Sequence, residues 1–138
     1  MTPHQATVVA IGGARAVMIE GAPGSGKSSL ALALIDRGAV LVGDDAVLLE
    51  ASGDTLLASP HPRVTGLIEV RNLGLLHMPV ARAVPVALVL ILDPAAPRHI
   101  EAADRVERAG VTLPMIRLYP DSPVLALRAE MALMQYGQ

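Results

Sequence analysis

The start of the chain alternates short apolar runs with glycine-rich turns, which predicts strands and a helix. Residues 6–11 and 16–19 are apolar and partly β-branched, and the Gly12-Gly13 pair between them is typical of a hairpin turn. Residues 28–36 are rich in leucine and alanine and predict a helix that ends near Gly38, where a glycine cap is common. We therefore expect a β-hairpin that leads through a glycine-rich loop into a helix.

The rest of the chain shows further strand patterns and two weaker helix patterns. Short apolar runs predict strands at residues 40–42, 47–50, 56–57, 67–70, 86–92 and 115–118. Residues 100–109 carry opposite charges four positions apart and predict a short exposed helix. Ser122 and Pro123 are typical of a helix start, and that helix is expected to run to residue 134. Residues 73–78 are apolar without a clear period and predict no element.

The composition narrows the fold class. The chain has 138 residues, a hydrophobic content of 52% and a mean hydropathy of +0.49. This length fits one compact domain, so we expect a single domain over residues 1–138. The apolar residues are almost all aliphatic, with no Phe or Trp and two Tyr. Such a composition is typical of buried strands covered by Ala- and Leu-rich helices and predicts an α/β fold.

Charge and residue usage exclude several classes of function. The net charge of −2, without a basic run or aromatic platform, argues against nucleic acid or an anionic membrane as partner. The absence of cysteine excludes disulfides and thiolate metal sites. The longest apolar run, residues 84–92, is about half of the roughly 20 residues that a membrane helix needs. The N-terminus lacks a signal-peptide pattern, so we expect a soluble, cytoplasmic protein.

Residues 21–28 match the phosphate-binding (Walker A) pattern Gly-x-x-x-x-Gly-Lys-Ser. In such a loop the backbone N–H groups surround a phosphate, Lys27 reaches its terminal oxygens, and the Ser28 hydroxyl binds Mg²⁺. The alternative is a chance glycine turn before a helix, but Lys27 is the only lysine beside ten arginines. The nucleotide-binding residues expected from this loop are Gly21, Ala22, Pro23, Gly24, Ser25, Gly26, Lys27, Ser28 and Ser29.

The Asp44-Asp45 pair follows the strand expected after that helix. At such a strand end one carboxylate, Asp44, can hold magnesium, while the next, Asp45, can accept a proton from an attacking hydroxyl. A solvated Gly-Asp-Asp turn is the alternative interpretation. The spacing from the phosphate loop favours the catalytic one.

A second acidic position and the histidines are less specific. Glu69 and Arg71 lie two positions apart on an expected strand, so both side chains would face one side of the sheet. Glu69 would suit a metal and Arg71 a transferred phosphoryl group, with a surface ion pair as the alternative. The histidines are scattered without metal-ligand spacing: His4, His61, His77 and His99.

These features occur together and in order: His4 ahead of the apolar hairpin, the loop and helix of residues 21–32, residues 35–47 with the aspartate pair, and residues 66–74. This set, over about half the chain, resembles the catalytic domain of bacterial HPr kinase/phosphorylase in a short form without the family's N-terminal domain. The resemblance implies a P-loop NTPase-like fold of the PEP carboxykinase type. That fold has a central mixed β-sheet with flanking helices and an N-terminal β-hairpin leading into the P-loop.

The resemblance also implies an activity and roles for the site residues. Members phosphorylate a serine of the phosphocarrier protein HPr with ATP or pyrophosphate and Mg²⁺, and remove it by phosphorolysis. By resemblance, the loop and Lys27 hold the β-phosphate, and Ser28 and Asp44 hold magnesium. Asp45 would exchange the proton, and His4 would pair with Asp45 and tune its ionisation.

The signature segment of the family contains Glu69 and Arg71, and the chain departs from the family at nearby and distant positions. Ser29 stands where glutamate is common, Asn72 replaces a usual glycine, and residues 118–123 replace an arginine-bearing stretch of longer members. Longer members assemble as hexamers, and the sequence leaves an oligomer open.

Two other functions stay open from the residues alone. A small-molecule P-loop kinase would need an arginine-rich lid, for which Arg98, Arg105 and Arg108 are candidates. A regulatory ATP-binding module of the phosphotransferase system would keep the loop without turnover.

Overall fold

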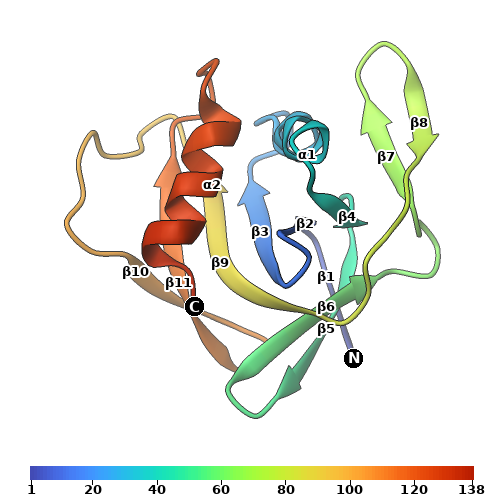
Figure 1. The fold of residues 1–138 in the computed structure, drawn as a ribbon, viewed down its shortest axis with the longest axis horizontal. Helices are drawn as coiled ribbons and strands as arrows, with labels where there is room; N and C mark the ends of the chain where they lie inside the picture. Colours follow the sequence, from blue (N-terminus) through green and yellow to red (C-terminus); the bar gives the residue numbers. More distant parts are fainter.

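The computed structural model describes residues 1–138, which form one extensive β-sheet, a separate two-stranded ribbon and two helices (Figure 1). The elements are β1 Thr2–His4, β2 Thr7–Ile11, β3 Arg15–Gly21, α1 Lys27–Asp36, β4 Val40–Gly43, β5 Val47–Ser52, β6 Thr55–Pro60, β7 Leu67–Val70, β8 Gly74–His77, β9 Val84–Leu92, β10 Asp104–Arg108, β11 Val111–Leu118 and α2 Leu125–Tyr136. The expected hairpin, loop and helix at the start of the chain are confirmed.

The sheet is mixed and has β9 near its middle. Its strands follow the order β1-β5-β6-β9-β3-β2-β4, and β11 pairs with β9 as well as with β10. The first residues of β9 pair antiparallel with β6, while its later residues run parallel to both β3 and β11. Strand β9 pairs with β6 at its start and with β3 and β11 further along, and the sheet curves along this strand (Figure 1). The predicted α/β class and central mixed sheet are confirmed.

The central strands are apolar on both faces because each face is covered. In β3, Val17 and Ile19 belong to a cluster of 17 buried residues that includes both helices. The alternate residues Ala16 and Met18 belong to a second cluster of 16, which fills the space enclosed by the outer strands. The period of two in the strand thus divides its side chains between two cores.

Helix α1 begins at Lys27 directly after the glycine loop, and Gly38 follows its end with a positive φ of 108°. The Gly38 N–H donates to Ile35 and the Ala39 N–H to Leu34, which satisfies carbonyls at the helix end. The predicted glycine cap is confirmed. The helices are joined on the outside by an ion pair between Arg37 and Glu130 at 2.8 Å.

The helix expected at residues 100–109 is wrong: residues 104–108 form strand β10, antiparallel to β11. Ala109 and Gly110 connect the two strands with φ angles of 49° and 82°. Two successive positive φ values match a tight hairpin turn whose twist suits paired strands. Val106 is the only apolar side chain of β10 and packs on the second core, so pairing and burial outweigh the charge pattern of an isolated helix.

The start of one helix and the presence of one strand also differ from the sequence prediction. Helix α2 begins at Leu125 and not at Ser122, because Ser122 and Pro123 form a turn in which the Ser122 hydroxyl accepts from the Val124 N–H. Residues 74–77, for which no element was predicted, form β8 and pair with β7. Strand β8 is exposed along its whole length, so burial imposes no period on its sequence.

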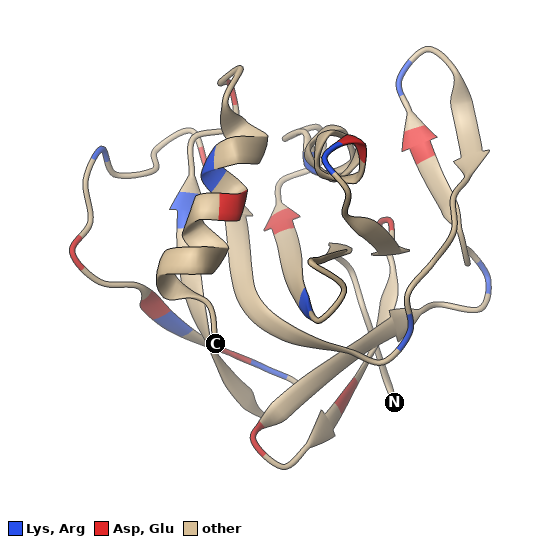
Figure 2. Ribbon diagram, viewed as in Figure 1, with Lys and Arg blue, Asp and Glu red and all other residues tan.

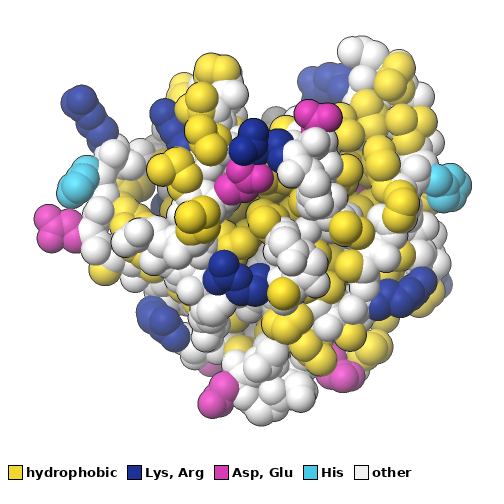
Figure 3. Space-filling model, viewed as in Figure 1, with side chains coloured by type: hydrophobic (Ala, Val, Ile, Leu, Met, Phe, Trp, Pro, Cys, Tyr) yellow, Lys and Arg dark blue, Asp and Glu magenta, His cyan; other side chains and the backbone are white.

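The β7–β8 ribbon extends away from the main sheet beside α1 (Figure 1). Ile68 is fully buried in the core cluster that contains residues of α1, and it anchors the ribbon. Leu73 and Leu75 remain 68% and 65% exposed, and hydrophobic side chains gather over this ribbon in the space-filling view (Figure 3). Asn72 in its turn has a φ of 72°, which explains why glycine suits the position and why asparagine is tolerated.

Charged residues of both signs are distributed over the whole fold, and most lie in turns or near strand ends (Figure 2). No helix is long and apolar enough to cross a membrane.

Candidate active site

The phosphate loop connects β3 to α1 and is shaped by close backbone packing. A Cβ atom at Gly21 would lie 2.7 Å from the Ser25 hydroxyl and 3.1 Å from the Leu92 carbonyl oxygen. The residue also has a φ of 155°, at the edge of the left-handed range that favours glycine. Gly21 therefore lets the loop turn tightly over the end of β9.

The loop presents several polar groups without partners. The N–H groups of Gly26, Lys27 and Ser28 have no hydrogen-bond acceptor, and no side chain caps α1. The Ser25 hydroxyl is buried and also lacks a partner. Such orphan donors at a helix N-terminus are suited to bind the oxygens of an anion. The residues of the loop thus fit a phosphate group.

Lys27 bonds only to carbonyl oxygens of its own loop, at 3.0 Å from Gly21 and 3.1 Å from Ala22. No carboxylate pairs with it. Its ammonium group can therefore turn to an incoming phosphate without breaking an ion pair.

Asp44 is the centre of a group that we call the Asp44 cluster, made of Thr7, Ser28, Asp44 and the backbone of Glu69. The Asp44 side chain accepts hydrogen bonds from the Ser28 hydroxyl at 2.7 Å, the Thr7 hydroxyl at 2.9 Å and the Glu69 N–H at 3.0 Å. Asp44 is 7% exposed. All three donors are neutral, so no cationic side chain pairs with this carboxylate.

Asp45 has a different environment although it is the next residue. Its φ is 66°, and its side chain is exposed to the pocket. The Gln5 amide donates to the Asp45 carboxylate at 3.3 Å, and the Asp45 N–H donates to Thr7 at 3.3 Å. The left-handed backbone is uncommon for a residue with a Cβ atom.

Glu69 and Arg71 line the same pocket as the phosphate loop. Glu69 lies in β7 and Arg71 in the turn after it, and both side chains are exposed and lack an ion-pair partner. The contact of Glu69 with Asp44 is made by its backbone N–H and not by its carboxylate. The surface ion pair considered from the sequence is not formed.

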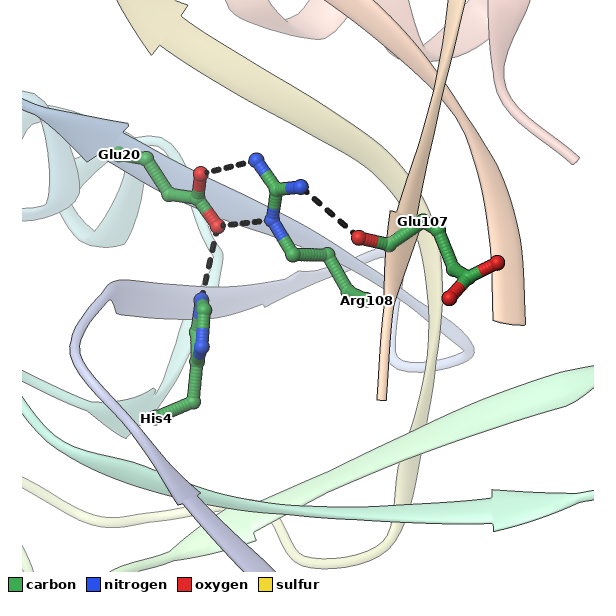
Figure 4. A network of polar contacts seen from close by, with 4 residues as sticks. All are labelled: His4, Glu20, Glu107 and Arg108. Carbon is green, nitrogen blue, oxygen red and sulfur yellow. Dashed lines mark hydrogen bonds and ion pairs between the residues drawn. The ribbon is translucent and has the colours of Figure 1, made fainter. Parts of the chain in front are cut away.

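His4 has another partner than the resemblance implied. It does not pair with Asp45; its Nε2 lies 2.8 Å from Oε2 of Glu20, and Arg108 contacts both oxygens of the same carboxylate (Figure 4). Arg108 donates through Nε at 3.0 Å and through a terminal nitrogen at 2.7 Å. We call His4, Glu20 and Arg108 the Glu20 cluster. It joins β1, β3 and β10 beside the loop.

The environment of Glu20 favours its ionised form. Burial alone would raise the pKa of Glu20, but hydrogen bonds and positive charge from Arg108 and His4 outweigh burial and hold the pKa below its ordinary value. The same pairing raises the pKa of Arg108. Sequence reasoning missed Glu20 and considered Arg108 only as part of a lid, not as the partner of Glu20. A charged residue at the end of an apolar strand, next to the phosphate loop, was the available signal for Glu20.

These residues surround one cavity of about 730 Å³. It brings together the loop, His4, Asp44, Asp45, Glu69 and Arg71. The candidate lid residues Arg98, Arg105 and Arg108 do not line it. Arg98 lies at a second groove beside α2, and the Arg108 side chain bonds to Glu20 and to the Glu107 carbonyl. The structure thus does not bring those arginines together over the loop.

The protein oxygens in the pocket would be enough to hold magnesium only if phosphate oxygens complete its coordination. No group of three or more His, Cys, Asp or Glu side chains is arranged to hold a metal. Ser28 and Asp44 supply a hydroxyl and a carboxylate 2.7 Å apart. Mg²⁺ is commonly held by one or two protein oxygens with phosphate oxygens and waters, so this pair fits it.

Comparison with known proteins identifies the same region. The sequence model described as the HPr Serine kinase C-terminal domain matches residues 2–83. HPr kinase/phosphorylase of Mycoplasma mycoides subsp. mycoides SC is 31% identical over 97 residues, which is 65% of this chain and 31% of that protein. The Clostridium botulinum enzyme of that name is 46% identical over 63 residues, 45% of this chain and 20% of its own length.

A solved structure extends the likeness to nearly the whole chain. The Hpr(Ser) kinase/phosphatase from Coxiella burnetii superposes with a TM-score of 0.81 and 25% identity, over 97% of this chain and 95% of that one. By contrast, the chain spans about a third or less of the length of the curated relatives that it matches.

Proposed function

The chain belongs to the family of HPr serine kinase C-terminal domains, and on that premise we propose that it transfers a phosphoryl group from ATP to a serine hydroxyl of an HPr-type phosphocarrier protein. Residues 1–138 would act as a single P-loop kinase domain. A cytoplasmic location is part of the proposal because ATP is available there.

The observation that carries the proposal is the Asp44-Asp45 pair directly beside a loop with unpaired N–H groups. The Ser28 hydroxyl lies 2.7 Å from Asp44, while Asp45 points separately into the same cavity. Phosphoryl transfer needs a phosphate cradle, a metal ligand and a group that accepts the proton of the attacking hydroxyl. The pocket offers one candidate for each.

For the donor, we propose that the loop N–H groups and the Ser25 hydroxyl bind phosphate oxygens and that Lys27 leaves its loop carbonyls for the β-phosphate. Pyrophosphate offers the same oxygens and is the second candidate donor. The loop residues that make this cradle are Gly21, Ala22, Pro23, Gly24, Ser25, Gly26, Lys27, Ser28 and Ser29.

For the metal, Ser28 and Asp44 would hold Mg²⁺, with Glu69 as a further carboxylate at the pocket wall. The bound ion would neutralise charge on the phosphates. Asp44 suits this role because its three hydrogen bonds come from neutral groups and leave its charge uncompensated.

For the acceptor, we propose that Asp45 takes the proton of the serine hydroxyl, oriented by Gln5 at 3.3 Å. Arg71 lines the same pocket and would meet the transferred phosphoryl group. His4 pairs with Glu20 and would act indirectly, by holding β1 so that the following residue, Gln5, reaches Asp45. Reverse phosphorolysis would use the same groups, with Asp45 returning the proton.

The test combines the protein with MgATP and HPr and identifies phosphoserine on HPr by mass spectrometry. An HPr variant with alanine in place of the acceptor serine is the matched control. Phosphoserine on wild-type HPr alone is expected. Its absence at every protein concentration, despite MgATP binding, would favour the regulatory module, and phosphorylation of a small molecule instead would favour the other kinase class.

Lys27→Ala separates a working loop from a structural one. We expect the variant to lose donor binding and turnover, measured by calorimetry and by the HPr assay. A variant that still binds MgATP tightly and transfers phosphate would contradict the role of the loop.

A further inference from the structure

Glu20 brings a negative charge to the place where an anionic donor must bind. It is the last residue before Gly21, whose carbonyl oxygen accepts the Lys27 hydrogen bond at 3.0 Å. Its carboxylate lines the phosphate pocket and is 15% exposed. A carboxylate so close to the cradle would repel polyphosphate unless its charge were compensated.

The compensation comes from a distant part of the chain. Arg108 grips both Glu20 oxygens, with distances of 3.0 and 2.7 Å, and its own side chain is 24% exposed (Figure 4). A two-point contact between guanidinium and carboxylate is geometrically specific. Arg108 is further fixed by a hydrogen bond to the Glu107 carbonyl at 2.9 Å. The arginine therefore stays on Glu20 rather than in the cavity.

The Glu20 carboxylate has a second task. It accepts the His4 Nε2 contact at 2.8 Å and so anchors β1, whose next residue, Gln5, holds Asp45. One carboxylate thus connects the strand that enters the phosphate loop with the strand that orients the proposed proton acceptor.

We propose that Arg108 is a positioning residue for the phosphoryl donor, because by compensating the charge of Glu20 it allows polyphosphate to bind at the phosphate loop. Glu20 in turn holds His4, and through it Gln5, beside the proposed proton acceptor Asp45. This inference rests on the proposed function. Loss of Arg108 would leave an uncompensated carboxylate that repels the donor and attracts Lys27, the only lysine of the chain.

The experiment is a double-mutant cycle of Arg108 and Glu20, in which calorimetry measures the affinity for MgATP and for magnesium pyrophosphate. Arg108→Met should weaken binding of both by about tenfold. Glu20→Gln combined with Arg108→Met should restore wild-type affinity to within about twofold, because the repelling charge is gone. The matched control, Arg105→Met, removes an exposed arginine of the same strand and should leave affinity unchanged.

Two further variants distinguish charge compensation from a purely structural tie. Arg108→Lys keeps the charge, loses the two-point grip and should bind the donor within about threefold of wild type. Glu20→Gln alone should bind the donor at least as well as wild type but transfer phosphate several-fold more slowly, a change in kcat without a rise in the donor KM.

Each outcome decides the inference. Unchanged donor affinity in Arg108→Met would overturn it, and so would a double variant as weak as the single one, since that would indicate lost folding and not lost charge compensation. If Arg108→Met does not fold, Arg108→Lys with weak binding overturns it and with near-normal binding supports it. Donor binding tests this inference, whereas phosphoserine on HPr tests the proposed function, so the two can fail separately.

Discussion

The carboxylates of Asp44 and Glu20 line the same pocket but have different partners. Asp44 receives three hydrogen bonds from neutral donors and pairs with no cationic side chain. Glu20 bonds to Arg108 and His4, and the guanidinium of Arg108 compensates its negative charge. Hydrogen bonds from neutral groups orient a carboxylate without cancelling it, whereas a two-point arginine contact does both. The pocket thus separates a carboxylate available to a cation from one that is not.

The largest effect is expected beside the Asp44 cluster, at Asp45. Asp45→Asn should lower turnover by about 10² to 10⁴ and leave donor affinity largely intact, because it removes proton transfer but not the cradle. Steady-state kinetics with HPr and calorimetry with MgATP would measure the two quantities. Asp54→Asn, in an exposed turn, is the control. Unchanged turnover would assign the proton to another group.

The next effect tests directly whether the two carboxylates differ. Asp44→Asn should weaken magnesium-dependent donor binding by about 10- to 100-fold, whereas Glu20→Gln should leave the magnesium dependence within about twofold. The measurement is MgATP affinity as a function of magnesium concentration. Equal losses in both variants would show that the proposed division between the clusters does not exist.

Thr7 allows a test of how the Asp44 cluster is built. Its hydroxyl donates to Asp44 and accepts from the Asp45 N–H, and Thr7 is 1% exposed. Thr7→Val should lower the free energy of unfolding by about 2 kcal/mol, because both partners lose a buried hydrogen bond. Urea unfolding would measure it, with the exposed strand residue Thr112 changed to valine as control. A loss no larger than that of the control would contradict the bridging role.

The smallest effect concerns the pH dependence contributed by the Glu20 cluster. Because the pKa of folded Glu20 lies below its ordinary value near 4.5, ionised Glu20 stabilises the fold above that pH, and the stabilisation is lost as the pH falls through the folded pKa. The advantage of wild type over Glu20→Gln, about 1 kcal/mol at pH 7, should therefore shrink as the pH falls below about 5.

Urea unfolding between about pH 3 and pH 7 would measure this difference. Glu50→Gln, which makes the same change at an exposed position of β5, is the control. An advantage that grows toward acid pH would contradict the assignment of the pairing to Glu20.

Much of the fold near the loop was predictable because its signals are local. The hairpin, the loop, α1 with Gly38 and the strand before Asp44 each depend on residues a few positions apart, and all four are confirmed. The error at residues 100–109 has the opposite origin. Charges four positions apart favour a helix only when no sheet edge competes, and β11 supplies such an edge.

The site residues also divide into those that local sequence signals predict and those whose partners depend on the tertiary structure. Lys27, Ser28 and the aspartate pair were predicted from spacing, and the structure brings them to one pocket within the family match of residues 2–83. His4 was singled out, but its partner was wrong. A histidine in β1 meets a glutamate in β3 only after the sheet has curved, and no spacing in the sequence encodes that approach.

By itself, then, the sequence determined the phosphate loop, its helix and the acidic turn, since backbone sterics and short-range hydrogen bonds act between near neighbours. Only the tertiary structure decided which carboxylates keep their charge. Arg108 reaches Glu20 across 88 positions because the hairpin of β10 and β11 closes on the curved sheet. Electrostatic compensation depends on distance in space, and that distance exists only once the sheet has formed.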